Sequence, residues 1–311
     1  MTLLLTRSDL EAVLEPESCL AALRAGFRDA DAVPVAGRRV RTDLPFPGTA
    51  TALLPGLLPG IEAYTVKVNA KFPGARPALR GVLCLHSGAD GELLALLDSA
   101  TITAWRTGLA AALGTHHLAG PGDVLGVIGA GAQAQLMLRG LRALRAYGDL
   151  AVHDTDGDRA ADFAARHGGR LLGSAREVAA VADTVLLATW SRSPLLSLAD
   201  TRPGQHFTSL GADEPGKQEL AADLLEAALL VVDDRELAAA MGALAAADLP
   251  AEAADTTLGA VLHGTHPGRT SATARSVYAP VGLPWQDLAL AWVAYRAAER
   301  QGVGQRVDLL G

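Results

Sequence analysis

The chain lacks several features that would assign it to a common functional class. It has only two cysteines, Cys19 and Cys84, in 311 residues, and their spacing fits neither a disulfide framework nor a metal site. We therefore expect both to be small buried side chains in a reducing cytoplasm, and we expect no bound metal. No apolar run approaches the ~18 residues that a membrane-spanning helix needs, and the N-terminal residues do not have the pattern of a signal peptide.

Positive charge is also scarce. Lysine and arginine together number 27, against 34 aspartates and glutamates, which gives a formal net charge of −7. This balance argues against nucleic acid or an anionic membrane as the main partner. Hydrophobic residues make up 50% and charged residues 20% of the chain, which is typical of a soluble α/β protein. The length allows two domains, each with its own core.

The most informative stretch is a glycine-rich turn after a short apolar run, 124–128, which predicts a buried parallel strand. Gly129 would allow a sharp turn, Gly131 would let the backbone approach a pyrophosphate, and Ala134 would let helix and strand pack closely. The free N–H groups at the start of the following helix, 133–147, would face the phosphates. A dinucleotide site is therefore expected, with a simple turn that binds nothing as the alternative.

The acidic residue that such a site requires is also present. The next predicted strand, 150–153, ends at Asp154, at a distance from Gly129 close to the ~20 residues expected of the acid that bonds the adenosine ribose. Asp154 would repel a 2′-phosphate, and neighbouring Thr155 is not basic. The sequence thus predicts NAD(H) rather than NADP(H), although Arg159 on the following helix could still hold a phosphate.

The first third of the chain has the pattern of a mainly antiparallel sheet with helices, without a βαβ rhythm. The predicted elements are helices that begin near Ser8 and span 16–31 and 101–118, and strands over 38–45, 61–72, 82–86 and 92–98. In strand 61–72, Thr65, Lys67 and Asn69 share one face. From the pattern alone, this polar face could be open to water, which the pattern favours, or could line a polar cavity.

From residue 123 onward the rhythm is βαβ, after a Gly-Pro-Gly linker. The predicted strands are 124–128, 150–153, 170–172, 183–189, 206–210 and 229–232. They predict an α/β chain with a doubly wound parallel sheet of the Rossmann type, whose crevice would be formed by loops 189–193 and 211–217. An amphipathic helix over 285–301, with Leu288, Ala291, Trp292 and Tyr295 on one face, is expected to pack back on the first domain. The expected domains are 1–119 with 285–311, and 120–284.

Seven sequence blocks in this order are similar to those of one known family. They are Thr65-Val-Lys67-Val, Leu94-Ala-Leu-Leu-Asp98, Ile102-Thr-Ala-Trp-Arg106-Thr107, Gly129-Ala-Gly-Ala-Gln-Ala134, Leu210-Gly-Ala-Asp213-Glu-Pro-Gly-Lys-Gln-Glu-Leu220, His266-Pro-Gly-Arg269 and Val281-Gly-Leu-Pro-Trp-Gln-Asp287-Leu. Along most of its length the chain resembles the ornithine cyclodeaminase/mu-crystallin family. This resemblance implies a homodimer in which substrate-binding domains close into a shared β-barrel, with a Rossmann domain attached to each.

The resemblance also implies roles for individual residues. The polar face of the Lys67 strand would look into the active site, and Arg41, Lys67 and Arg106 would hold the carboxylate and amine region of the substrate. The positive charge of the arginines would favour neutral Lys67, which suits proton transfer. Asp213 would handle protons and water. Alternatively, Arg41 and Arg106 are surface charges and Asp213 caps a helix before Leu220.

The implied cofactor is NAD, bound by residues of the turn and the neighbouring loops. These are Thr107, Gly129, Ala130, Gly131, Ala132, Gln133, Asp154, Thr155, Thr189, Ser191 and Gly211. The implied activity is that of an oxidoreductase or cyclodeaminase at the Cα–N bond of a small α-amino acid or its linear or cyclic imine, by hydride transfer through an iminium intermediate. The alternative is a ligand-binding protein of mu-crystallin type without turnover. Leu54-Pro55 and Tyr278-Ala-Pro280-Val-Gly282 depart from the cyclodeaminase pattern, which argues against ornithine itself.

Overall fold

The structure, a computed structural model, describes residues 1–30, 39–45, 48–72, 75 and 78–309. It divides into two compact units, Met1–Arg106 with Leu283–Gly311 (unit 1) and Thr107–Gly282 (unit 2). The sequence predicts boundaries at 119/120 and 284/285, whereas the units meet at 106/107 and 282/283. The first boundary differs more because helix α3 (Ser99–Leu118) contributes residues to both units.

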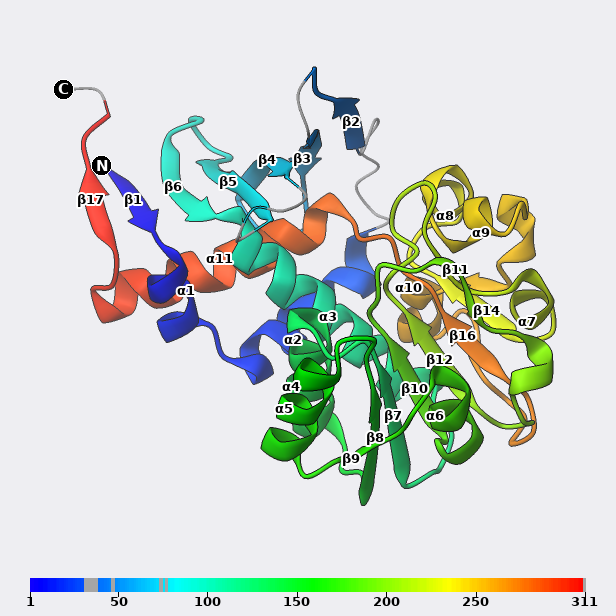
Figure 1. Cartoon of the computed structure of the whole chain (residues 1–311). Coiled ribbons are helices and arrows are strands. Elements are labelled where there is room, and N and C mark those ends of the chain that lie inside the picture. Colours follow the sequence, from blue (N-terminus) through cyan, green and yellow to red (C-terminus); the bar gives the residue numbers. More distant parts are fainter. Residues whose placement is uncertain (31–38, 46–47, 73–74, 76–77, 310–311) are drawn as a thin grey trace. The chain divides into compact units, whose positions relative to one another are not determined.

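Unit 1 contains a mainly antiparallel sheet, as predicted, in the order β17-β1-β6-β5-β4-β3-β2 (Figure 1). Its strands are β1 (Thr2–Leu5), β2 (Arg39–Asp43), β3 (Thr49–Gly56), β4 (Ala63–Lys71), β5 (Leu79–Ser87), β6 (Leu93–Asp98) and β17 (Gln305–Val307). The pair β1–β6 is parallel. The sequence pattern predicts β2, β4, β5 and β6 but misses β1, β3 and β17; Arg38, at the start of the predicted strand 38–45, lies outside the described residues.

The helices of unit 1 begin where the sequence supplies caps. Thr6 and Asp9 form a capping box at the start of α1 (Arg7–Val13), and Pro16 occupies the first turn of α2 (Pro16–Asp29). The predicted helix over 16–31 extends to Asp31, which lies outside the described residues. Helix α11 (Pro284–Gln301) ends at Gly302, whose φ of 68° is left-handed.

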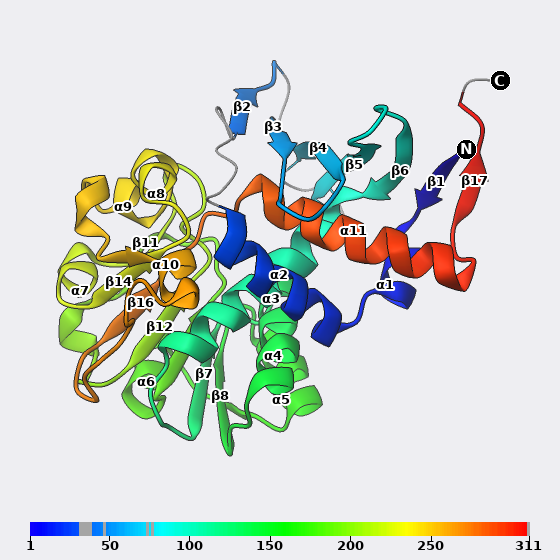
Figure 2. The same ribbon diagram turned by 180° about the vertical axis from the view of Figure 1, so that it is seen from behind.

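Helix α11 packs against α2 and against strands β3 and β4, and Figure 2 shows α2 beside it. The two helices approach closely because Gly26 has no side chain where the ring of Trp285 lies, and Phe27 meets that ring edge-on at 4.9 Å. The predicted buried face of helix α11 is partly wrong. Leu288 and Ala291 are buried, whereas Trp292 and Tyr295 are half-exposed and the alanines Ala294 and Ala298 take the inner positions.

Strand β4 buries most of its polar face, whereas its apolar face is half-buried apart from an exposed valine. Thr65, Lys67 and Asn69 are 2%, 3% and 9% exposed, whereas Val68 on the opposite face is 49% exposed. The solvent-facing alternative for the polar residues is therefore wrong. The apolar face continues onto β5, where Val82 is 39% exposed, and apolar side chains exposed in this way are typical of an interaction surface.

Unit 2 contains a parallel sheet in the order β15-β14-β16-β12-β10-β7-β8-β9, which confirms the Rossmann-type fold. Its strands are β7 (Val124–Ile128), β8 (Asp149–His153), β9 (Arg170–Leu171), β10 (Thr184–Leu187), β12 (His206–Ser209), β14 (Leu229–Val232), β15 (Thr256–Thr257) and β16 (Ser276–Tyr278). The chain runs outward through β7, β8 and β9, then crosses to β10 and continues in the other direction. The carboxyl ends of β7 and β10 therefore border the switch point, where ligands of such sheets bind.

The prediction of six strands is incomplete because β15 and β16 are two and three residues long, too short to produce a recognisable pattern. Strand β16 pairs between β12 and β14. The remaining elements are α4 (Ala132–Leu144), α5 (Gly157–His167), α6 (Ala175–Val181), α7 (Ala222–Glu226), α8 (Arg235–Met241), α9 (Ala243–Ala246), α10 (Leu258–His263), and the short pair β11 (Arg192–Leu196) with β13 (Gln218–Leu220).

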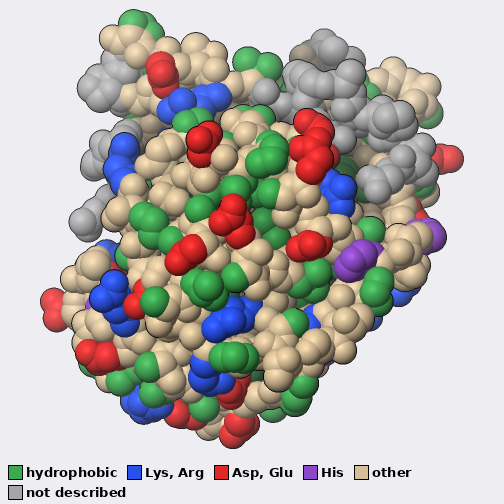
Figure 3. All heavy atoms as spheres, turned by 90° about the vertical axis from the view of Figure 1, so that its right-hand side faces the viewer, with side chains coloured by type: hydrophobic (Ala, Val, Ile, Leu, Met, Phe, Trp, Pro, Cys, Tyr) green, Lys and Arg blue, Asp and Glu red, His purple; other side chains and the backbone are tan. Residues whose placement is uncertain are grey.

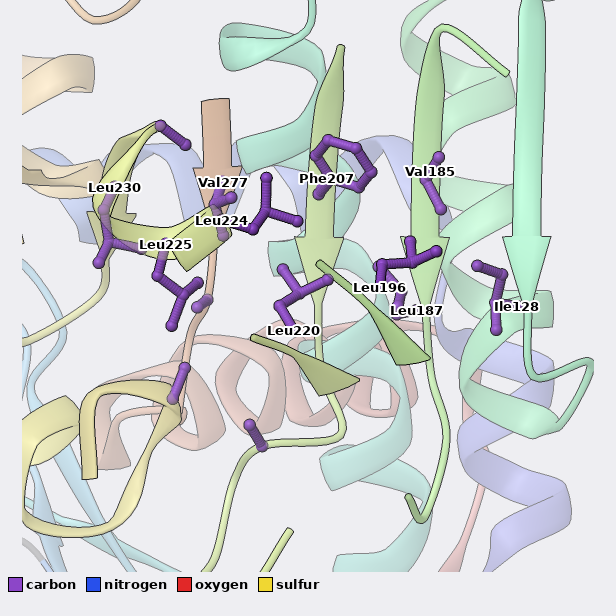
Figure 4. Packing of buried hydrophobic residues seen from close by; sticks show 14 of the residues in the cluster. Ile128, Val185, Leu187, Leu196, Phe207, Leu220, Leu224, Leu225, Leu230 and Val277 are labelled. Atoms are coloured by element: carbon purple, nitrogen blue, oxygen red, sulfur yellow. The ribbon is translucent and has the colours of Figure 1, made fainter. Parts of the chain in front are cut away.

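The core of unit 2 lies between the parallel sheet and the helices on it. Figure 4 shows Val185 and Phe207 on neighbouring strands, with Leu224 of α7 near Val277 of β16. Each fully buried side chain of this size contributes roughly 1.5–3 kcal/mol to folding relative to an exposed one. This packing fixes the strand ends from which the loops of the candidate site emerge.

Acidic and basic side chains are interspersed on the face shown in Figure 3, in keeping with the modest negative net charge. None of the described helices combines the length and apolarity required to cross a bilayer. Within the same residues, no group of three or more His, Cys, Asp or Glu side chains could hold a metal ion.

Candidate functional site

Unit 1 contains a buried cluster of charged residues centred on a lysine. Lys67 of β4 donates from Nζ to both carboxylate oxygens of Asp287 at 2.7 Å, and to Thr103 Oγ1 at 3.1 Å. Lys67 and Asp287 are 3% and 1% exposed. Asp287, an opposite charge at this distance, acts against the effect expected of the neighbouring arginines, so a neutral Lys67 stays a prediction.

Arg106 of α3 belongs to the same cluster. Its Nε lies 3.6 Å from Asp287 Oδ1, and its Nη1 donates to Gln286 Oε1 at 3.4 Å. The Arg106 side chain is 9% exposed, so it is not a surface charge, and its buried Nε has no hydrogen-bond partner among the residues that the structure describes. Lys67 and Arg106 therefore share the carboxylate of Asp287, and the Nε–H of Arg106 is left for a further acceptor.

The local sequence explains why these side chains meet. Thr103 and Arg106 are three residues apart on α3 and therefore share one face of the helix. At the start of that helix, Ser99 Oγ donates to Asn69 Oδ1 on β4, and Asn69 Nδ2 reaches Thr103 Oγ1 at 3.5 Å. These contacts fix the polar face of β4 against the first turns of α3.

Arg41 does not join this cluster. It lies on the edge strand β2 and pairs with Asp43, at 3.2 Å between Nη2 and Oδ1, with 34% of its side chain exposed. Of the three predicted substrate-binding residues, the structure brings together Lys67 and Arg106 and adds Asp287. Asp287 was not predicted as a site residue, although it belongs to one of the sequence blocks quoted above.

The glycine-rich turn of unit 2 has the expected geometry. Gly129 has a φ of +88°, and a Cβ on it would lie 2.6 Å from Ala188 O, so only glycine fits. The space beside Gly131 is open, and Gly131 provides no side chain to cap α4, so the first N–H groups of this helix remain for a ligand. The open space beside Gly131 and the free N–H groups fit a dinucleotide phosphate.

Asp154 lies directly beneath this turn. Its Oδ2 accepts a hydrogen bond from the Ala130 N–H at 2.7 Å, and its Oδ1 accepts one from the Asp156 N–H at 2.9 Å. Arg159 bridges the same carboxylates, with Nη1 3.4 Å from Asp154 Oδ2 and Nη2 2.8 Å from Asp156 Oδ2. Asp154 thus orders the glycine-rich turn, while Thr155 beside it is exposed.

The loops after β10 and β12 are joined by a carboxylate that sequence reasoning missed. Glu219 of β13 is completely buried and accepts hydrogen bonds from the N–H and Oγ–H of Thr189, from Ser209 Oγ and from the Gly211 N–H. Burial raises the pKa of Glu219, and the four hydrogen bonds oppose this rise. Ser191 is linked to Glu219 through Thr189, because the Ser191 N–H donates to Thr189 Oγ1.

Asp213 follows in the second of these loops and is not a helix cap. The residues after it form a turn and then β13, so the helix-capping alternative is wrong. Lys217 Nζ lies 2.9 Å from Asp213 Oδ1 and 2.9 Å from Glu214 Oε1, and 4.2 Å from the centre of the Trp190 ring. Burial lowers the pKa of Lys217, but the two carboxylates outweigh it and the net shift is upward.

Known proteins share this architecture along the whole chain. The sequence profile of the ornithine cyclodeaminase/mu-crystallin family matches residues 1–302. Alanine dehydrogenase of Archaeoglobus fulgidus is 30% identical over 318 aligned positions, which cover 98% of both chains.

Two solved structures share the fold of this chain over nearly its whole length. An archaeal alanine dehydrogenase dimer with bound NAD is 28% identical and superposes with a TM-score of 0.93 over 99% of both chains. The Delta(1)-pyrroline-2-carboxylate reductase of Thermococcus litoralis, in complex with NADH and L-proline, is 27% identical. It superposes with a TM-score of 0.91 over 98% of this chain and all of the other.

Proposed function

The chain belongs to the ornithine cyclodeaminase/mu-crystallin family, and on this premise we propose that it is an NAD(H)-dependent oxidoreductase or cyclodeaminase. Its substrate would be a small α-amino acid or the corresponding imine, which is cyclic where the side chain permits ring closure. The reaction would take place at the Cα–N bond, through an iminium form of the substrate. The observation that carries this proposal is the buried guanidinium of Arg106, which lies next to Asp287 and whose Nε has no hydrogen-bond partner within the described part of the chain.

A substrate carboxylate would be a second anion for this guanidinium, beside Asp287, and would accept the hydrogen bond that Nε can still donate. Arg106 can bond it in the planar two-bond geometry that arginine provides. Fixing the carboxylate in this way orients Cα and the amine, and such positioning can supply ~7–11 kcal/mol of the barrier in favourable cases. Arg41, the other predicted clamp residue, would have to exchange its partner Asp43 for the substrate.

Lys67 and Asp213 would have different tasks. Lys67 is oriented by Asp287 and Thr103, and it would exchange one of these partners to donate a hydrogen bond or a proton to the substrate. Asp213 is 38% exposed at its side chain, which suits a group that exchanges protons with water. It would protonate a leaving amine or activate water that attacks the iminium carbon.

The dinucleotide would accept or supply the hydride when bound. We propose that unit 2 holds it through the glycine-rich turn (Gly129 to Gln133), with Thr107, Asp154, Thr155, Thr189, Ser191 and Gly211 as further contacts. NAD(H) is preferred to NADP(H) because Asp154 would oppose a 2′-phosphate. The NAD and NADH bound in the two similar structures support this choice.

We further propose a homodimer that covers the outward face of the unit 1 sheet. Val40, Val68 and Val82 are 52%, 49% and 39% exposed on strands β2, β4 and β5. β2 also leaves one side of the sheet unpaired within the described residues, which favours a partner. The similar archaeal alanine dehydrogenase is a dimer. Light scattering that finds an active monomer at micromolar concentration would contradict this proposal.

The test of the function is nicotinamide absorbance with a panel of small amino acids and of linear and cyclic imines. Turnover in either direction with one class identifies the reaction, and alanine, proline and their imines come first because of the similar proteins. If compounds of the panel bind tightly without any change in absorbance, the chain would be a ligand-binding protein of mu-crystallin type and not an enzyme.

A further inference from the structure

Glu219 has no part in the proposed function, although it is completely buried beside residues that do. We propose that Glu219 is a positioning residue that holds Thr189 and Gly211 in the arrangement that binds the dinucleotide. The inference rests on the proposed function, because it requires a dinucleotide at the glycine-rich turn.

A single carboxylate joins two loops of unit 2. Oε1 of Glu219 accepts from the N–H and the Oγ–H of Thr189 at 2.7 and 2.8 Å, directly after β10. Oε2 accepts from Ser209 Oγ and from the Gly211 N–H, both at 2.7 Å, at the end of β12. Four donors require the lone pairs of an ionised carboxylate, which a protonated acid or an amide cannot all supply.

These loops touch the glycine-rich turn. A Cβ on Gly129 would lie 2.9 Å from Thr189 Cγ2, and a Cβ on Gly211 would lie 2.6 Å from Thr189 O. Gly129, Thr189, Gly211 and Glu219 therefore form one contiguous layer. The layer lies at the carboxyl ends of β7, β10 and β12, where the switch point places the ligand crevice. A shift of Thr189 would move the wall of this crevice.

The test compares Glu219→Gln with a change at Asp183, a carboxylate at the opposite ends of the strands that also accepts from two backbone N–H groups. Asp183 accepts from the N–H groups of Asp123 and Val124 at 3.0 and 3.1 Å, at the amino ends of the strands. In NADH fluorescence titrations well below the Tm, Glu219→Gln should raise the Kd on the order of tenfold, as expected for the loss of hydrogen bonds to a charged group. Asp183→Asn should lower the Tm and leave the Kd unchanged.

A wild-type Kd in folded Glu219→Gln would overturn the inference and leave the carboxylate a purely structural group. If Glu219→Gln does not fold, Ser209→Ala removes one donor and keeps the charge. It should raise the Kd a few-fold, and an unchanged Kd would again overturn the inference. The wild-type titration separates the two proposals: a wild type that binds no dinucleotide overturns the proposed function together with this inference, whereas normal wild-type binding with unaltered variants overturns the inference alone.

Discussion

Lys67 and Asp287 lie 220 positions apart in the chain, yet Lys67 Nζ is 2.7 Å from both carboxylate oxygens of Asp287 in the interior of unit 1. This ion pair joins strand β4 to helix α11, so the C-terminal helix supplies part of the candidate substrate site. The pair also explains how a lysine can be buried on the polar face of a sheet. Its cost of desolvation is offset by good geometry and by the additional bond to Thr103.

The first prediction concerns this ion pair. Asp287→Asn leaves two buried cations, Lys67 and Arg106, without their carboxylate, so the free energy of unfolding should fall by ~3–5 kcal/mol. Adding Lys67→Met removes one of these cations and should restore part of the loss. Urea unfolding of both single variants and the double variant gives the coupling energy. Strictly additive losses would show that the pair does not act as a unit.

The second prediction concerns Arg106. Lysine keeps the charge but cannot form the planar two-bond contact with a carboxylate, so Arg106→Lys should mainly raise the KM for the amino acid or imine and change kcat little. Steady-state kinetics on the substrate found in the panel measure this split. Arg176→Lys, at an exposed ion pair with Asp200 in unit 2, is the control and should behave as the wild type. A fall in kcat at unchanged KM would contradict the clamp.

The third prediction is a preference for NADH over NADPH. Asp154 would repel a 2′-phosphate, and the nearest guanidinium, that of Arg159, is bonded to Asp154 and Asp156. Asp154→Ser combined with Thr155→Arg removes the negative charge and adds a cation, so the preference should shift toward NADPH. Parallel titrations with the two cofactors decide the matter. Equal or tighter binding of NADPH by the wild type would refute the prediction.

The fourth prediction concerns His206, which is completely buried between Ser276 Oγ and Thr208 Oγ1, each 2.9 Å from a ring nitrogen. Burial lowers the pKa of His206 to about 3. The unfolded chain takes up this proton near its ordinary pKa of ~6.5, whereas the folded chain does not. The contribution to stability is therefore complete above ~6.5 and is lost progressively as the pH falls toward 3.

At about pH 5 this loss should reach ~2 kcal/mol relative to neutral pH. His206→Gln, which cannot take up the proton, should show a correspondingly smaller decline in unfolding free energy between neutral pH and pH ~5. His263→Gln removes an exposed histidine and should follow the wild type. Parallel curves for the wild type and His206→Gln would contradict the assignment.

The sequence predicts features whose causes are local. The glycine-rich turn could be found because an apolar run, two glycines and an acid follow one another at fixed spacing. Asp287 could not be predicted as the partner of Lys67, since no local sequence pattern around either residue indicates a contact between distant parts of the chain. The role of Glu219 could not be predicted for another reason. It follows a run of polar residues that is typical of a solvated loop, and only the short strand β13 buries it. Strand β16 escaped because three residues give no periodicity.

The last prediction separates chemistry from binding at Asp213. If Asp213 transfers protons, it acts in the transition state, so Asp213→Asn should lower kcat by ~10²–10⁴-fold with little change in cofactor affinity. Asparagine keeps the shape and can still accept a hydrogen bond from Lys217, which lies 2.9 Å away. Glu214→Gln is the matched control, because it removes the other carboxylate that Lys217 contacts and leaves the proposed acid intact. Its kcat should remain near that of the wild type. Steady-state kinetics beside NADH fluorescence titrations distinguish the cases: a normal kcat in Asp213→Asn would reduce Asp213 to a partner of Lys217, and equal losses in both variants would assign the effect to the position of Lys217.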